Sequence, residues 1–525
     1  MLRRLVWCLV PVLGCTGIIS DGPGSISMEE AEAVGVSGLR RLTRVELEAT
    51  LTDLVGETQP LARTLLPPDP TDPFDNDYRL QLASTTLVDS LEELAKQTAE
   101  RTVADPVRRA QVLPCMPTGA NDATCFRLFV RTFGRKALRR PMVDDEVERF
   151  MPLHALGVEK NAFDTGVTLA LRAFLQHPEF IYRVELGTPT GQTGVQGLNG
   201  YHRATRLSYL LVGSTPPDWL LDSAAAGDLS SRDGVRTAAQ RLLDDPRSRN
   251  QVERFHALWL GYHRLPHAAQ LTAAMQAESD ALVDRVVFDR SADYFTLFTA
   301  SDTFIDGTLA THYGLTANGT ATAWTAYGNA PRKGLLSHGS VLSQGVKFAD
   351  SSPTQRGIFI RNRLFCQEIP PPPPGVNVDE QPTSTSPCKK NRYSAHASVG
   401  GCKGCHDSID PIGFGLERYD RQGRYRTTDD GLPQCTIDGE GDVGGTKFNG
   451  PTGLADALIA SGQFEECITT QVFRYAAGRR EESRDRAFIR RVSKQFIASD
   501  RKFLDLMVEL VSDDAFAFRR DEEAL

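Results

Sequence analysis

Residues 402–406, C-K-G-C-H, place two thiols and an imidazole in one short stretch of the chain. Cys402 and Cys405 are three residues apart, so they occupy neighbouring positions on a helical turn. Thiols at this spacing can form thioethers with two vinyl groups on one porphyrin edge, and the adjacent His406 can then ligate the iron. Cysteine and histidine each make up only 10 of 525 residues, so chance rarely produces this pattern. The spacing predicts one covalent c-type haem.

Three other kinds of site use the same residue types. A dithiol redox pair usually begins a helix after a buried strand, whereas the polar stretch "SAHASVGG" precedes this motif. A zinc site could combine Cys402 and Cys405 with Cys388 and His396. A local disulfide between Cys402 and Cys405 is the simplest alternative. Haem is favoured, and these alternatives stay open at the level of the sequence.

An export signal is predicted at the start of the chain. Arg3 and Arg4 form a positive region, and residues 5–14 form an apolar stretch too short to span a bilayer. The stretch ends in V-L-G-C, which resembles a bacterial lipoprotein signal and predicts lipidation of Cys15. An ordinary cleaved signal or an uncleaved anchor is the alternative. No later stretch has 18 uninterrupted apolar residues, so no further membrane span is expected.

The predicted location is therefore outside the cytoplasm, in the periplasm or at the outer membrane or cell surface. This compartment is oxidising, and bacterial haem attachment to C-x-x-C-H also occurs there. Without Cys8, Cys15 and the motif pair, an even number of cysteines remains, which favours disulfides: Cys115, Cys125, Cys366, Cys388, Cys435 and Cys467. Cys115 and Cys125 flank the turn-rich loop "MPTGANDAT" and are the best pair. The sequence does not determine how the other four are connected.

The sixth ligand of the iron, opposite His406, has several candidates in the sequence. Met507 is the only methionine after the motif, and it shares a helical stripe with Phe503, Leu506 and Leu510. This pattern favours a packed core position for Met507 rather than an iron ligand. The nearest upstream histidines are His396 and His338. We expect no methionine on the iron.

Calcium is a less favoured second cofactor, since two acidic segments offer hard oxygen ligands: Asp72, Asp75 and Asp77, and Asp438, Glu440 and Asp442. Neither segment has the full loop with a terminal bidentate glutamate. Solvated loops with Asx turns are favoured for both.

Composition predicts an ordinary globular protein, with 40% hydrophobic and 24% charged residues. The net charge of −8 and the lack of a basic block argue against nucleic acid as a partner. The periodicity is mostly helical. In residues 43–56, Thr43 and Glu46 form a capping box, apolar residues recur on one face, and Gly56 ends the helix. Residues 421–450 instead predict one or two β-hairpins, so the fold class is mainly α.

Shifts in composition predict seven segments. They are a lipoprotein signal (1–15), a tether (16–36), an N-terminal helical domain (37–110), a helical domain with the Cys115/Cys125 loop (111–187), a central helical domain (188–325), a proline-rich linker with the C-x-x-C-H module (326–430), and a C-terminal hairpin and helical domain (431–525).

Several stretches together resemble a known family. They include "RLTRVELEATLTDLVG", "CFRLFVRTFGRKALRRPM", "RATRLSYLLVGSTPPDWLL" and "CKGCHDSIDPIGFGLERYDRQGRYR". In this order they are similar to planctomycete-type exported proteins built from successive domains of unknown function. The resemblance covers nearly the whole mature chain. It implies a helical body with a cytochrome-c-like C-x-x-C-H module near the C-terminus, and it implies no particular reaction.

The favoured function is a cell-envelope lipoprotein that carries one covalent haem and exchanges electrons with an unidentified redox partner. We expect Ile412, Phe414 and Leu416 to exclude water from one haem edge, with Asp410 and Tyr419 as nearby hydrogen-bonding residues. One alternative is a peroxidase-like haem enzyme. The other is a non-catalytic surface scaffold or binding protein with a structural Cys/His cluster.

Overall fold

The computed structural model describes residues 28–522 apart from 317–320, 373, 375–376, 383, 399–401 and 430. Its many helices and small two- or three-stranded sheets confirm the mainly α prediction. The helices up to residue 313 are α1 (Met28–Glu32), α2 (Arg44–Val55), α3 (Leu61–Leu65), α4 (Thr85–Ala104), α5 (Pro106–Val112), α6 (Ala123–Ala137), α7 (Asp144–Glu148), α8 (Met151–Glu159), α9 (Phe163–Leu175), α10 (Pro178–Ile181), α11 (Gly200–Leu211), α12 (Asp218–Ala226), α13 (Arg232–Leu243), α14 (Arg247–Trp259), α15 (Ala269–Asp284), α16 (Thr296–Thr299) and α17 (Gly307–Tyr313).

The later helices are α18 (Gly339–Leu342), α19 (Pro353–Leu364), α20 (Lys389–Ala397), α21 (Lys403–Phe414), α22 (Gly450–Ala460), α23 (Phe464–Ala477), α24 (Asp485–Ala498) and α25 (Phe503–Ser512). The strands are β1 (Arg40–Arg41), β2 (Tyr182–Arg183), β3 (Thr188–Pro189), β4 (Val195–Gly197), β5 (Asp302–Ile305), β6 (Ala323–Ala326), β7 (Val346–Lys347), β8 (Asp350–Ser351), β9 (Thr428–Asp429), β10 (Leu432–Thr436), β11 (Glu440–Val443), β12 (Thr446–Asn449) and β13 (Phe518–Arg520).

Where local sequence signals are strong, they determine where a helix begins and ends. Thr43 accepts a hydrogen bond from the Glu46 backbone while the Glu46 side chain accepts one from Thr43, and Gly56 ends α2 with φ +67°. The capping box and glycine stop are thus confirmed. The pairs β9–β10 and β11–β12 confirm the predicted hairpins between residues 421 and 450.

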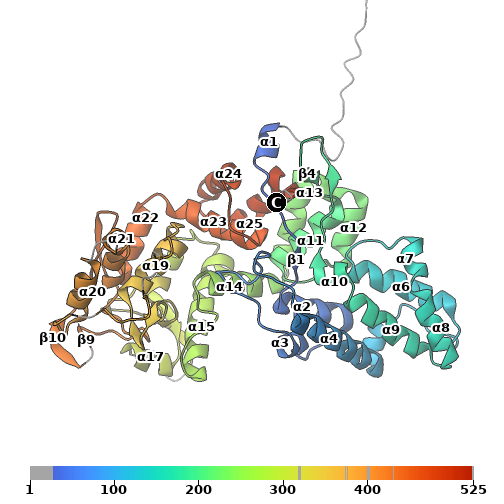
Figure 1. Cartoon of the computed structure of the whole chain (residues 1–525), viewed down its shortest axis with the longest axis horizontal. Coiled ribbons are helices and arrows are strands. Elements are labelled where there is room, and N and C mark those ends of the chain that lie inside the picture. Colours follow the sequence, from blue (N-terminus) through green and yellow to red (C-terminus); the bar gives the residue numbers. More distant parts are fainter. Residues whose placement is uncertain are drawn as a thin grey trace, which may run out of the picture.

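Two large apolar cores hold the helices together. One gathers α2–α9, with Phe126, Phe129 and Phe174 fully buried. The other runs from α11 to α25 and includes Trp259 and Met507. In Figure 1, α6–α9 lie at one end of the long axis, α20 and α21 lie at the other, and α14, α23 and α25 lie between them. The C-x-x-C-H segment therefore shares its core with the central and C-terminal helices.

The C-terminal strand closes back on earlier parts of the chain. Strand β13 pairs antiparallel with β4, and Arg520 also bridges to Val36. Residues 28–36 were predicted to belong to the tether. They instead form α1 and this bridge, with Val34 buried.

Three disulfides bind the described cysteines outside the motif, as the sequence predicted. The pair Cys115–Cys125 is confirmed. The remaining pairs are Cys366–Cys467, which joins the end of α19 to α23, and Cys388–Cys435, which joins the start of α20 to β10. Within the described part of the chain, no helix is long and apolar enough to cross a bilayer.

Candidate functional site

Helix α21 carries the motif at its first turn. Cys402 is the N-cap residue, Cys405 and His406 follow inside the helix, and the His406 backbone N–H donates to the Cys402 carbonyl at 3.2 Å. Cys402 is half-buried and Cys405 is exposed, and both are free thiols. The structure therefore does not support a local disulfide between them. It places the two thiols and the imidazole within about one turn at the start of one helix, as the haem prediction requires.

The zinc alternative is wrong in the form first considered. Cys388 is bonded to Cys435, so its thiolate is not available as a zinc ligand. Among the described residues, no group of three or more His, Cys, Asp or Glu side chains is placed to hold a metal ion. The His396 side chain lies outside the described residues, as does Cys15.

Cys402, Cys405 and His406 all line one cavity of about 270 Å³. Much of its wall is apolar, because it is formed by Phe348, Ile358, Ile369, Pro370, Tyr393 and Ile409. Pro370 belongs to the segment predicted from the sequence as a proline-rich linker, so this linker contributes directly to the wall around the motif. An apolar wall excludes water and lowers the local dielectric, which is the environment that tunes a haem's reduction potential.

The residues predicted to exclude water from the haem edge, Ile412, Phe414 and Leu416, do not line this cavity. Ile412 and Leu416 are buried in the large core, and Phe414 lines a different cavity. The reason is helical geometry: Ile409 lies on the face of α21 that carries the motif, whereas Ile412 points into the core. Tyr419 is also remote from the motif, since its hydroxyl donates to the Pro331 carbonyl.

Asp410 contacts the motif through the side chain of His406. Its Oδ2 lies 2.9 Å from His406 Nδ1, and its Oδ1 accepts a hydrogen bond of 2.7 Å from the Thr354 hydroxyl of α19. The hydrogen bond to Asp410 raises the pKa of His406 above its ordinary value, against the opposing effect of burial. The i,i+4 spacing of His406 and Asp410 could be recognised in the sequence. Thr354 could not, because it comes from a distant segment.

Two glycines bring α19 and α21 together at this point. A Cβ at Gly357 would lie 2.0 Å from the Ile409 carbonyl oxygen, and one at Gly413 would lie 1.8 Å from the Pro353 carbonyl oxygen. Only glycine allows backbones to approach this closely. The crossing therefore fixes Thr354 against Asp410.

A buried cluster of charged side chains also joins α19 to the start of α20 and to the segments that follow α21. Glu417 accepts hydrogen bonds from Arg356 at 2.8 Å and from Lys389 and Arg426 at 2.9 Å. Burial raises the pKa of Glu417, but these three cations outweigh it and hold the pKa below its ordinary value. No local sequence pattern indicates this cluster, since its members come from α19, the start of α20 and the segments after α21.

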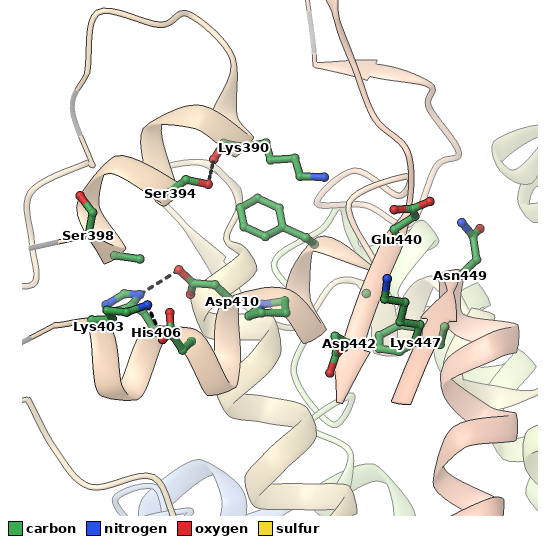
Figure 2. A pocket seen from close by; sticks show the side chains of 16 residues that line it. Lys390, Ser394, Ser398, Lys403, His406, Asp410, Glu440, Asp442, Lys447 and Asn449 are labelled. Atoms are coloured by element: carbon green, nitrogen blue, oxygen red, sulfur yellow. Dashed lines mark hydrogen bonds and ion pairs between the residues drawn. The ribbon is translucent and has the colours of Figure 1, made fainter. Parts of the chain in front are cut away.

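A second, more polar cavity of about 760 Å³ lies on the other side of His406. Figure 2 shows His406 and Asp410 on α21 facing Lys390 and Ser394 of α20, with Glu440, Asp442 and Lys447 on the β11–β12 hairpin. His406 therefore lines both cavities, whereas Asp410 lines the more polar one.

Two residues considered as iron ligands lie elsewhere. Met507 is buried in the large core, which confirms its predicted packing role. His338 is fully buried, and its Nδ1 lies 3.1 Å from the Ser279 hydroxyl. Neither residue lines the cavity that contains the motif.

The acidic segments are engaged in ion pairs. Asp75 pairs with Arg254, Asp72 with Arg480, and Asp438 with Lys390. These contacts give three of the six carboxylates an ion-pair partner within the chain.

The motif residues fit a covalent haem. Two free thiols and one imidazole line a common, largely apolar cavity. His406 also has a carboxylate partner on Nδ1, the arrangement that orients metal-bound histidines.

Family models match five successive segments, each described as a protein of unknown function: residues 40–104 (DUF1587), 125–185 (DUF1595), 198–315 (DUF1592), 332–429 (DUF1588) and 444–516 (DUF1585). Such a succession is typical of planctomycete-type multi-domain proteins. The motif lies within the 332–429 match, and none of the five descriptions names a cytochrome module or a reaction. No curated protein and no solved structure matches the chain.

Proposed function

We propose that this chain of five successive domains of unknown function is a cell-envelope lipoprotein that binds one covalent haem and transfers electrons. Cys402 and Cys405 would form the thioethers, and His406 would ligate the iron. One observation carries the proposal: the two free thiols line the same cavity as His406, while the other described cysteines are all in disulfides.

When bound, the haem would supply a one-electron redox couple. The chain's own residues would hold, orient and shield it. Ile358, Ile369 and Ile409 would exclude water from the cavity, and Asp410 would fix the orientation of the His406 ring. The two thiols would set the position of the haem edge relative to α21.

The test is a pyridine haemochrome spectrum and an intact mass of the full chain, expressed with a bacterial haem-maturation system. We expect a mass increase equal to one haem and a c-type spectrum. Cys402→Ala and Cys405→Ala should each remove one thioether and shift the reduced spectrum, and His406→Ala should abolish stable ligation. Met507→Ala, a core change away from the cavity, is the control and should keep the wild-type spectrum in the protein that folds. Purified wild-type protein without covalent haem would refute the proposal.

Anchoring by Cys15 is tested separately. Cys15→Ala should abolish fatty-acid labelling and move the protein from the detergent phase of a phase-separation assay to the aqueous phase. Equal labelling of wild type and Cys15→Ala would remove the lipoprotein part of the proposal and leave the haem part standing.

A haem-dependent oxidoreductase is the second candidate, and the His406–Asp410 contact favours it. A histidine that donates to a carboxylate is a more basic iron ligand, and such a ligand stabilises oxidised iron. Rapid peroxide turnover by the haem-loaded protein would favour this candidate over an electron carrier.

A further inference from the structure

We infer that Asp410 is a positioning residue that lowers the reduction potential of the site by placing a buried carboxylate on His406. This inference rests on the proposed haem function and goes beyond it, because it assigns the control of the potential to a residue outside the C-x-x-C-H motif. The contacts that support it lie within α21 and between α19 and α21.

The first step is the geometry of the pair. His406 and Asp410 are one helical turn apart on α21, and His406 Nδ1 lies 2.9 Å from Asp410 Oδ2. A carboxylate accepts, so the imidazole donates its Nδ1 proton. This sets the tautomer in which Nε2 is the nitrogen that would ligate iron.

The second step is burial. Asp410 is only 4% exposed, so water screens its charge weakly. Two of the three lysines that line the adjoining polar cavity pair with other carboxylates: Lys403 with Asp407 at 2.7 Å and Lys390 with Asp438 at 2.5 Å. The third, Lys447, belongs to strand β12. Within the described chain, the ion pair that Asp410 forms is the one with His406.

The third step is rigidity. Thr354 donates to the second carboxylate oxygen at 2.7 Å, so each oxygen of Asp410 has a defined partner. Thr354 is itself held by the close crossing of α19 and α21, at which Gly413 lies against Pro353. The carboxylate therefore cannot rotate away from His406 without breaking contacts between two helices.

The contact with Asp410 should change the electron density of the His406 imidazole. Donation of the Nδ1 proton to a buried carboxylate increases electron density on the imidazole and makes it a stronger ligand for oxidised iron. A neutral partner in the same place would give a weaker effect. The site is therefore built for a lower potential than its apolar cavity alone would give, and its electron-exchange partner must work at a correspondingly low potential.

The experiment compares midpoint potentials of wild type and Asp410→Asn, with Asp407→Asn as the matched control. The Asp410→Asn side chain keeps an oxygen that can accept from Nδ1 but removes the charge, whereas Asp407 is an exposed carboxylate on the same helix that pairs with Lys403. We expect Asp410→Asn to favour reduced haem at least tenfold, a rise of about 59 mV for a one-electron couple. Asp407→Asn should change this equilibrium less than threefold, and Asp410→Glu should recover part of the wild-type potential.

A second measurement needs no variant of Asp410. Nitrogen NMR of His406 in haem-free Cys402→Ala/Cys405→Ala protein, at a pH where the imidazole is neutral, should show the proton on Nδ1. The opposite tautomer would overturn the inference even if Asp410→Asn failed to fold. Covalent haem with equal potentials in Asp410→Asn and Asp407→Asn would overturn this inference alone. Wild-type protein without covalent haem would overturn both this inference and the proposed function.

Discussion

Gly357 of α19 lies directly against the backbone of Ile409 in α21, so that a Cβ at position 357 would stand 2.0 Å from the Ile409 carbonyl oxygen. Position 357 is a glycine because the backbone of α21 occupies the space that a side chain would fill. The contact places Thr354 of α19 beside Asp410, and through Asp410 it sets the position of His406.

Gly357→Ala should therefore destabilise the protein, although alanine normally favours a helix by roughly 0.5–1 kcal/mol over glycine. Forcing a methyl group into a packed backbone contact should cost about 1–3 kcal/mol or more and separate the two helices. The matched control is Gly404→Ala in α21, where the added Cβ meets no atom within 4 Å. Urea unfolding should show a loss for position 357 and no loss for position 404, and equal midpoints would contradict the proposed crossing.

Two of the disulfides close loops of very different length, and their removal should have unequal effects. Cys366–Cys467 closes a sequence separation of 101, whereas Cys115–Cys125 closes one of 10. The chain-entropy model gives about 4.7 kcal/mol for a loop of ~100 residues and about 3 kcal/mol for one of ~15. Cys366→Ser/Cys467→Ser should thus lower the unfolding free energy more than Cys115→Ser/Cys125→Ser. Thermal unfolding under oxidising conditions measures both, and the reverse order would rule out the entropic explanation.

The sequence predicted features that depend on neighbours along the chain. The α2 capping box, the Cys115–Cys125 loop and the motif turn are all formed within about a dozen residues, where spacing determines geometry. It also predicted that Met507 is a core residue, because its helical stripe is local.

Contacts between distant segments could not be predicted in this way. Thr354 meets Asp410 only because α19 and α21 cross, and nothing in either segment alone specifies the partner. The same limit explains the mistaken cavity wall: Ile412 and Ile409 are both apolar, and only the packing of α21 decides which one enters the core. The connectivity of Cys366, Cys388 and their partners was undetermined for the same reason.

The buried carboxyl group of Glu278 should make the stability of the folded protein depend on pH. This fully buried residue accepts hydrogen bonds from Thr303 and Tyr313 at 2.6 Å, yet burial dominates and raises its pKa from 4.5 to about 7. The folded state then holds a proton that the unfolded state releases, so this residue's contribution to stability falls as pH rises from 4.5 to 7. Glu278→Gln removes that loss, which amounts to about 3 kcal/mol over the window.

The difference between the wild-type and Glu278→Gln stability profiles removes the contributions of groups that do not contact Glu278. His338 does contact it, since its Nε2 lies 3.7 Å from Glu278 Oε1. Burial lowers the pKa of His338 from 6.5 to about 3, so its contribution to stability rises with pH between these two values. Because its trend opposes that of Glu278, wild type should change little where the two windows overlap, and the variant should gain stability there. Urea unfolding at half-unit pH steps gives both profiles, and a pH-independent difference would show that Glu278 titrates normally in the folded protein.

Glu417 should be among the most sensitive positions behind the motif, because it is the shared acceptor of three buried cations. Glu417→Gln keeps the size of the side chain but leaves Arg356, Lys389 and Arg426 without their common carboxylate. Breaking a buried ion pair by removing one partner costs about 3–5 kcal/mol. We expect a loss near the lower end of this range, because Asp350 also pairs with Lys389 at 2.7 Å and compensates part of the charge. The exposed pair of Lys403 and Asp407 provides the contrast, since Asp407→Asn should cost no more than about 0.5 kcal/mol.

Because Arg356 and Lys389 belong to α19 and α20, limited proteolysis of Glu417→Gln should cut first around the motif, before the α2–α9 core opens. Simultaneous cleavage in both regions would show that the cluster stabilises the whole chain rather than the site.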